Sequence, residues 1–111
     1  MNSVIFIPEV REYFKSLIPV LYENGYFSFR EGARKYVKDL IDDIFKNLPT
    51  KTKKLAPLHF TDRYGERLYY ATFHKSKHTQ WYAFFIIYRV DGETYYQVRH
   101  IENNHTAAQY L

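Results

Sequence analysis

The first half of the chain contains one short β-like run followed by two helical patterns. Val4 to Ile7 is a β-branched and aromatic run that Pro8 ends, which predicts a short first strand leading into a helix. Asn24-Gly25 is a typical helix stop, and Pro19 is expected to kink or divide the helix before it. The helical stripe consists of Val10, Phe14, Leu17, Ile18 and Leu21.

A second helix is predicted from Ser28 to Pro49. Ser28 and Glu31 have the spacing of a capping box, in which the serine oxygen accepts from a free backbone N–H and the glutamate reaches back. The apolar face comprises Ala33, Tyr36, Val37, Leu40, Ile44 and Leu48. Residues 49–58 (PTKTKKLAPL) follow as a basic connection from this helix to a sheet.

The second half changes to a period of two and predicts three strands, at residues 67–73, 80–89 and 93–101. Asp91-Gly92 is a tight-turn signal between the last two strands, and residues 74–79 (HKSKHT) are expected to form a longer polar loop. The middle strand is apolar on both faces and is therefore expected at the centre of the sheet. The fold class predicted is α+β: a short N-terminal strand, two helices, then an antiparallel β-meander.

Strict alternation in the last strand places Tyr96, Val98 and His100 on one face, with Tyr95, Gln97 and Arg99 on the other. Arg99 and His100 are thus expected to point to opposite faces, with Arg99 on the side open to a ligand. His100 continues an apolar face and is expected to be a hydrogen-bonded core histidine.

Length and composition favour a single domain that spans residues 1–111. The chain has 46% hydrophobic residues, enough for one core, and no cysteine, so neither disulfides nor a thiolate zinc site is available. The N-terminal MNSVIFIPEVREYF has only a short apolar run without a basic region before it, which fits neither a signal peptide nor a membrane span. A cytoplasmic location is expected.

Positive charge is concentrated in one part of the chain. The formal net charge is +4, but residues 51–89 contain eight Lys/Arg and only two Asp/Glu, whereas residues 1–50 are balanced. Twelve tyrosines and nine phenylalanines are distributed among these charges. Cations beside aromatic rings suit stacking on unpaired bases, and they equally suit ordinary sheet packing.

Motifs for common enzyme classes are absent from the sequence. There is no G-x-G-x-x-G, P-loop, H-E-x-x-H or nucleophile elbow, and His74 and His78 lie in a predicted loop without a nearby carboxylate. We therefore expect no metal site and no cofactor. The candidate residues are dispersed: Arg67, His74, Lys75, Lys77 and His78 for binding RNA phosphate, and Arg99, His105 and Tyr110 for catalysis.

These residue types can cleave RNA without a metal. The reaction needs cations to hold the scissile phosphate, a base for the 2′-hydroxyl proton and an acid for the leaving oxygen. Each candidate also has a plain structural interpretation. In that interpretation, the lysines are ordinary solvated turn residues, Arg67 only flanks a strand, and Tyr110 only packs with Leu111.

The opening VIFIPEVREYF, the two helices and the ending YYQVRHIENNHTAAQYL together resemble the RelE/ParE superfamily of bacterial toxins. The resemblance implies a compact α+β toxin of a type II toxin-antitoxin system, inhibited by a cognate antitoxin protein. RelE-like members are endoribonucleases (mRNA interferases) that cut mRNA on the ribosome by 2′-hydroxyl attack, whereas ParE-like members inhibit DNA gyrase. By this resemblance Arg99 matches the arginine of the last strand, and His105 and Tyr110 occupy the acid/base region.

Two departures separate the chain from the RNase pattern: Tyr70, Ala71 and Thr72 stand where an arginine is common, and the tail extends past His105. Three functions therefore stay open. The first is a metal-independent, ribosome-dependent mRNA endonuclease with His105 as acid or base. The second is a non-nucleolytic, ParE-like inhibitor of DNA gyrase, and the third is an interaction domain without catalysis.

Overall fold

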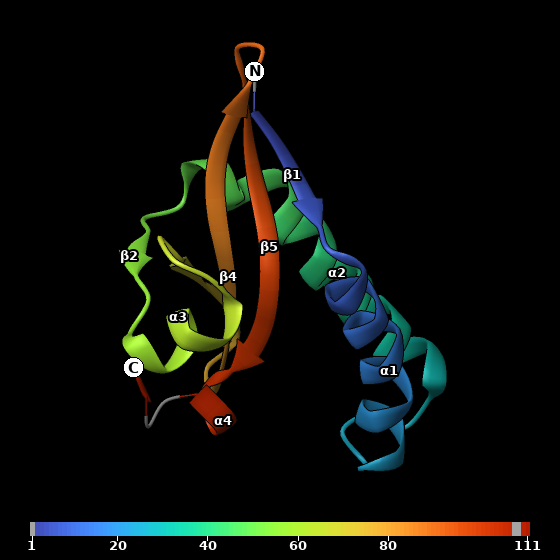
Figure 1. The fold of residues 1–111 in the computed structure, drawn as a ribbon. Helices are drawn as coiled ribbons and strands as arrows, with labels where there is room; N and C mark the ends of the chain where they lie inside the picture. Colours follow the sequence, from blue (N-terminus) through green and yellow to red (C-terminus); the bar gives the residue numbers. More distant parts are fainter. Residues whose placement is uncertain (1, 108–109) are drawn as a thin grey trace.

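The computed structural model describes residues 2–107, 110 and 111, and its centre is a five-stranded mixed sheet (Figure 1). The strands are β1 (Asn2–Phe6), β2 (Lys54–Leu55), β3 (Tyr69–Ser76), β4 (Thr79–Val90) and β5 (Glu93–Asn103). Their order is β1-β5-β4-β3-β2, in which β1 pairs with β5 in parallel and all other neighbours are antiparallel. The predicted α+β class and the central position of β4 are confirmed.

The two long helices occur where the apolar stripes predict them. They are α1 (Pro8–Glu23) and α2 (Arg30–Asn47), and a 3₁₀ turn, η1 (Leu48–Thr50), follows α2. Pro19 lies inside α1, which nevertheless continues to Glu23 as one helix. The capping-box prediction is wrong, because Phe29 is the N-cap of α2 and no side chain caps the helix. None of the helices within the described residues has the length and apolar character needed to cross a membrane.

The sheet has a core on each face. On one face α1 and α2 bury residues such as Phe14 and Leu40 against Phe73, Trp81 and Phe85 of the sheet. Figure 1 shows these two helices together on one side of the strands. This larger core fixes the positions of the sheet residues that alternate with it.

The other face is covered by a short helix that the sequence pattern does not reveal, α3 (Leu58–Tyr64). Phe60 of α3 is fully buried and stacks on Phe84 of β4, with ring centroids 4.3 Å apart. Leu68, Tyr82 and Ala107 complete this second core, and Ala107 comes from α4 (Asn104–Ala107). The connection predicted at residues 49–58 therefore contains the last two residues of η1, all of β2 and the first residue of α3.

The hairpin between β3 and β4 is tighter than predicted. Residues 74–76 belong to β3 and Thr79 to β4, so only Lys77 and His78 form the turn instead of a six-residue loop. A register shift between His74 and Ser76 accommodates this turn. At the other hairpin the prediction is confirmed, because Asp91 and Gly92 adopt φ of 51° and 82°.

A β-bulge interrupts the alternation of β5. Phe84 pairs with His100 and Phe85 pairs with Val98, so Arg99 is an extra residue without a partner on β4. The expectation that Arg99 and His100 point to opposite faces is wrong. Both side chains lie toward α3: Arg99 donates to the Tyr64 carbonyl oxygen, and the His100 ring stacks on the Tyr64 ring.

Candidate functional site

A basic hollow lies between the η1–β2 segment and β3, and we call it the basic groove. It has a volume of about 250 Å³ and is lined by Lys51, Thr52, Lys54, Tyr70, Thr72 and His74. Period-two alternation builds one wall, because Ala71 and Phe73 are buried against the two long helices while the residues between them face the other way. β2 builds the second wall by pairing Lys54 with Tyr70.

The chemistry of the basic groove is that of an anion site. Its lining includes two lysines, one imidazole and three hydroxyl groups, and no carboxylate. Lys51 places its Nζ 4.8 Å from the centre of the Phe73 ring, and neighbouring Lys53 lies 5.5 Å from that of Tyr69. These cation–π contacts are made by the ammonium groups and orient the two lysine side chains beside β3.

The predicted phosphate-binding residues do not converge on one site. His74 lines the basic groove, but Lys75 lies on the opposite face of β3, with its Nζ 5.2 Å from the centre of the Tyr36 ring. Lys77 and His78 are exposed at the turn, and Asn104 fixes this turn by donating to the His78 carbonyl oxygen. Arg67 is exposed in the segment between α3 and β3, where its φ is 56°.

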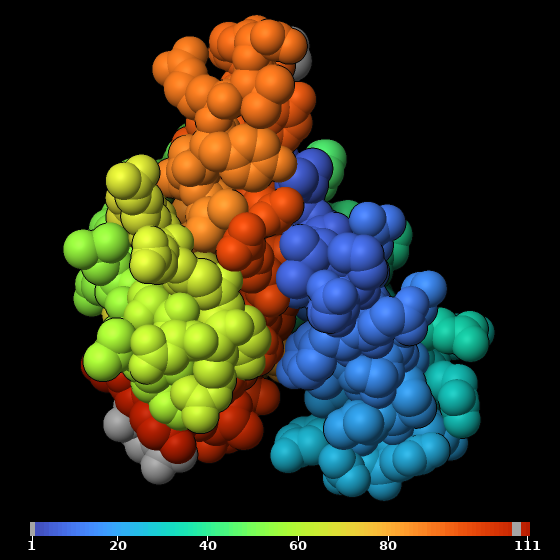
Figure 2. All heavy atoms as spheres, viewed as in Figure 1, coloured from blue at the N-terminus to red at the C-terminus, as the bar shows by residue number. Residues whose placement is uncertain are grey.

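Arg99 lies in a cleft between α1 and α3. Figure 2 shows β5, in orange-red, visible between the yellow-green surface of α3 and the blue surface of α1. Arg99 Nε donates to Gln97 Oε1 at 2.9 Å and Nη1 donates to the Tyr64 carbonyl oxygen at 3.0 Å. Arg99 thus ties the end of α3 to β5. Glu9 and Arg63 also line this part of the cleft, so its charge is mixed.

Beneath α3, the imidazole of His100 is paired with a carboxylate. His100 Nε2 lies 2.6 Å from Glu102 Oε1, and Glu102 Oε2 accepts from Thr106 Oγ1 at 3.1 Å. Burial raises the pKa of the stacked Tyr64, and the charge of Glu102 adds to this increase. His100 is therefore hydrogen-bonded, as predicted, but it lies next to the second core, on the opposite face of the sheet from Tyr96 and Val98.

His105 and Tyr110 lie apart from each other and from Arg99. His105 is exposed in the short α4 and lines a different pocket, described below, beside the two long helices. The ring of Tyr110 stacks on the ring of His59 in α3, with centroids 3.6 Å apart and planes at 5°. The three residues predicted for catalysis therefore do not share one site.

The pocket that His105 lines lies between the end of α1, the loop after it and the ends of β3, β4 and β5; we call it the aromatic pocket. Its volume is about 330 Å³. Tyr36 accepts a hydrogen bond from Trp81 Nε1 at 2.8 Å, and burial raises the pKa of Tyr36 despite this bond. Burial, assisted by Glu102, raises the pKa of nearby Tyr13 to about 12. Both tyrosines therefore keep their protons at neutral pH.

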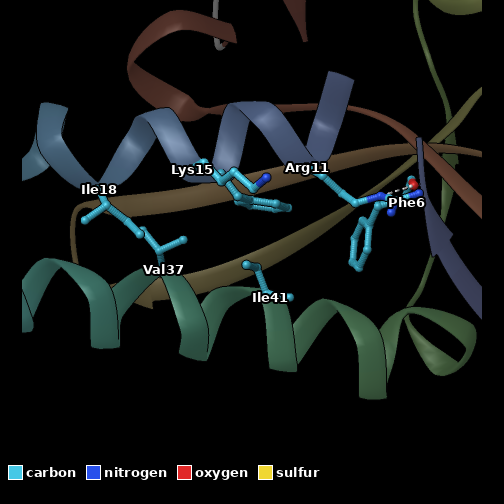
Figure 3. A pocket seen from close by; sticks show the side chains of 7 residues that line it. Phe6, Arg11, Lys15, Ile18, Val37 and Ile41 are labelled. Atoms are coloured by element: carbon cyan, nitrogen blue, oxygen red, sulfur yellow. Dashed lines mark hydrogen bonds between the residues drawn. The ribbon is translucent and has the colours of Figure 1, made fainter. Parts of the chain in front are cut away.

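A third hollow, which we call the apolar groove, lies between α1 and α2 and is almost entirely nonpolar (Figure 3). Phe6, Phe14, Ile18, Val37 and Ile41 line it, with Arg11 and Lys15. Arg11 Nε donates to the Phe6 carbonyl oxygen at 3.2 Å, which fixes this cation at one end. None of the residues predicted for catalysis or phosphate binding lies in this groove.

The comparisons with known proteins assign no family: no family model, curated protein or solved structure matches the chain. Among residues 2–107, 110 and 111, no three His, Asp or Glu side chains are grouped so that they could hold a metal ion. Any functional assignment therefore depends on the geometry of the chain itself.

Sequence reasoning missed Lys51, Lys54 and Tyr70 as site residues. The lysines lie in PTKTKKLAPL, whose sequence predicts a connection because its prolines obscure the two-residue strand. A usable signal was present, since the three lysines of residues 51–54 precede a strand in which Tyr70, Thr72 and His74 alternate with apolar residues. A strand pairing between these segments would have brought the two sets together.

Proposed function

We propose that the chain is the toxin of a type II toxin-antitoxin system and an endoribonuclease that cleaves mRNA at the basic groove. One observation carries the proposal: two lysines, an imidazole and a tyrosine hydroxyl line one hollow of about 250 Å³ that contains no carboxylate. These groups are the ones that metal-independent RNA cleavage requires. The resemblance of the sequence to RelE-like toxins points in the same direction.

In this proposal Lys51 and Lys54 hold the nonbridging oxygens of the scissile phosphate. The neutral His74 imidazole accepts the 2′-hydroxyl proton as the 2′-oxygen attacks phosphorus. The bond from phosphorus to the 5′-oxygen breaks, and a lysine ammonium group donates a proton to that oxygen. The products are a 2′,3′-cyclic phosphate and a 5′-hydroxyl, and proton return from His74 to the lysine completes the cycle.

The partners in this proposal are mRNA on the ribosome and a cognate antitoxin. The apolar groove between α1 and α2 suits apolar side chains of an antitoxin segment. Arg11 and Lys15 on its lining would favour acidic residues beside that segment. Its helical face is separate from the basic groove, so an antitoxin bound there would act by excluding the chain from the ribosome.

Controlled expression in bacteria tests the proposal, with growth and mRNA 5′ ends as readouts. The parent chain is expected to stop growth and produce new mRNA ends, and co-expression of its antitoxin to restore growth. His74→Ala and Lys54→Met should each reduce cleavage about 100-fold or more, because acid-base groups contribute about 10²–10⁴-fold. Lys46→Met is the matched control, since Lys46 is exposed on α2 and should be dispensable.

The same experiment separates the alternatives. If His105→Ala abolishes cleavage while His74→Ala does not, the basic groove is the wrong site. Growth arrest with intact mRNA and stalled DNA replication would instead support a gyrase inhibitor. A parent chain that leaves growth unaffected would contradict both toxin functions.

A further inference from the structure

The aromatic pocket lies on the opposite face of the sheet from the basic groove. Its lining combines rings with a polar rim. Trp81, Tyr36 and Phe27 form part of the wall, and Phe27 and Tyr36 pack with ring centroids 5.4 Å apart. The rim contains Ser76, Thr79, Asn103 and His105.

The rim carries hydrogen-bonding groups that have no protein partner among the described residues. In the described part of the chain, no hydrogen bond involves the hydroxyl of Ser76 or Thr79, the amide nitrogen of Asn103 or the ring of His105. Asn103 Oδ1 is already held by the His105 backbone N–H at 3.0 Å, which orients the side-chain amide. A flat ligand with several donors and acceptors along its edge would match such a rim.

Tyr26 supplies a second, independent observation. It lines the mouth of the aromatic pocket, is 70% exposed and stacks on no other ring among the described residues. A large aromatic side chain left exposed at the mouth of a pocket is positioned to stack on a planar ligand.

Charge and size narrow the ligand class. No Asp or Glu lines the pocket, which disfavours a cationic ligand. Lys75 lies outside the lining, with its Nζ 5.2 Å from the centre of the Tyr36 ring, and its charge adds to the hydrogen bond from Lys35 in lowering the pKa of Asp39. The volume of about 330 Å³ is at the small end for ligand pockets, as suits a single base.

We propose that the aromatic pocket binds a nucleobase, with Tyr26 stacking on its face and the rim of Ser76, Asn103 and His105 bonding its edge. The base comes either from a free nucleotide or from an RNA strand. This site does not depend on cleavage at the basic groove, because the two hollows lie on opposite faces of β3.

Trp81 makes the proposal measurable, since it is the only tryptophan of the chain and lines the pocket. The full chain is titrated with AMP, GMP, CMP and UMP, with a short single-stranded RNA, and with an abasic strand of equal length. Saturable change in Trp81 emission, confirmed by calorimetry, is expected with a mononucleotide or with the base-containing RNA. Binding of mononucleotides identifies a free-nucleotide site, and binding of RNA alone identifies a base within a strand.

Two variants complete the test. Tyr26→Ala should weaken binding about tenfold, since base stacking of this kind is worth about 1–3 kcal/mol. Tyr26 is exposed, so its replacement should leave the fold intact, which far-UV circular dichroism checks. His74→Ala should bind the nucleotides as tightly as the parent chain does. This result is expected whether or not the variant loses mRNA cleavage. No saturable change in Trp81 emission, an equal change with the abasic strand, or unchanged nucleotide affinity of Tyr26→Ala would overturn the proposal.

Discussion

Replacing Gly65 by alanine tests the link between α3 and β5. Gly65 ends α3 with φ 119° and ψ 159°, a conformation that is almost restricted to glycine and costs other residues about 1–3 kcal/mol. A Cβ atom there would lie 2.5 Å from Arg99 Nη1, so the guanidinium must move away. Its hydrogen bond to the Tyr64 carbonyl oxygen is then lost, at a cost of about 0.5–1.5 kcal/mol.

We therefore expect Gly65→Ala to lower the free energy of unfolding by about 2–4 kcal/mol in urea titrations. Gly25→Ala is the matched control, because Gly25 also has a positive φ, of 78°, but nothing lies within 4 Å of an added Cβ. That control should lose only about 1–2 kcal/mol, the cost of a left-handed backbone conformation for a residue other than glycine. In an Arg99→Ala background the extra cost at Gly65 should shrink. Equal losses at the two glycines would refute the reasoning.

Two further predictions concern the second core and the alkaline limit of stability. Phe60→Ala should reduce the free energy of unfolding in urea by about 3–5 kcal/mol, since Phe60 is fully buried. Leu58, in the same helix, is 72% exposed, so Leu58→Ala should change this free energy by less than about 0.5 kcal/mol in the same assay. The pKa of Tyr13 is raised from 10.0 to about 12, so the folded chain keeps a proton that the unfolded chain releases, and stability falls as pH rises from 10 to 12. Tyr13→Phe should remove up to about 2 kcal/mol of this loss in the free energy of unfolding, measured by urea unfolding across that pH range. An unchanged pH dependence would contradict the burial of the Tyr13 hydroxyl.

The elements that the sequence predicts well are those with long periodic patterns. Helices α1 and α2 carry apolar stripes over four or more turns, and β4 is apolar on both faces, so burial alone determines their type. β2 has only two residues and α3 only seven, and Pro57 stands directly before α3. Segments this short are specified by tertiary contacts, above all by the burial of Phe60, and local periodicity does not reveal them.

The candidate site was harder to predict because it depends on register. A single bulge at Arg99 moves the side chain of His100 from the face of Tyr96 and Val98 to the face of Arg99, and no residue type in YYQVRHIEN marks that position. The sequence predicts His74 and Lys75 in one loop, whereas the extension of β3 to Ser76 places them on opposite faces of the sheet. The partners of His74 come from residues 51–54, and only the pairing of β2 with β3 brings them together.

The parallel pairing of β1 with β5 has a consequence for synthesis on the ribosome. Residue 2 pairs with residue 94, so β1 has no partner strand until nearly all of the sheet has been translated. At about 5–20 residues per second, several seconds pass between the synthesis of β1 and that of β5. During this time β1 and the apolar side of α1 lack their partners in the sheet. During that interval the α1–α2 hairpin can form from local contacts, but the central sheet cannot close. The complete sheet, and every site that depends on β5, therefore arises only after β5 has been translated.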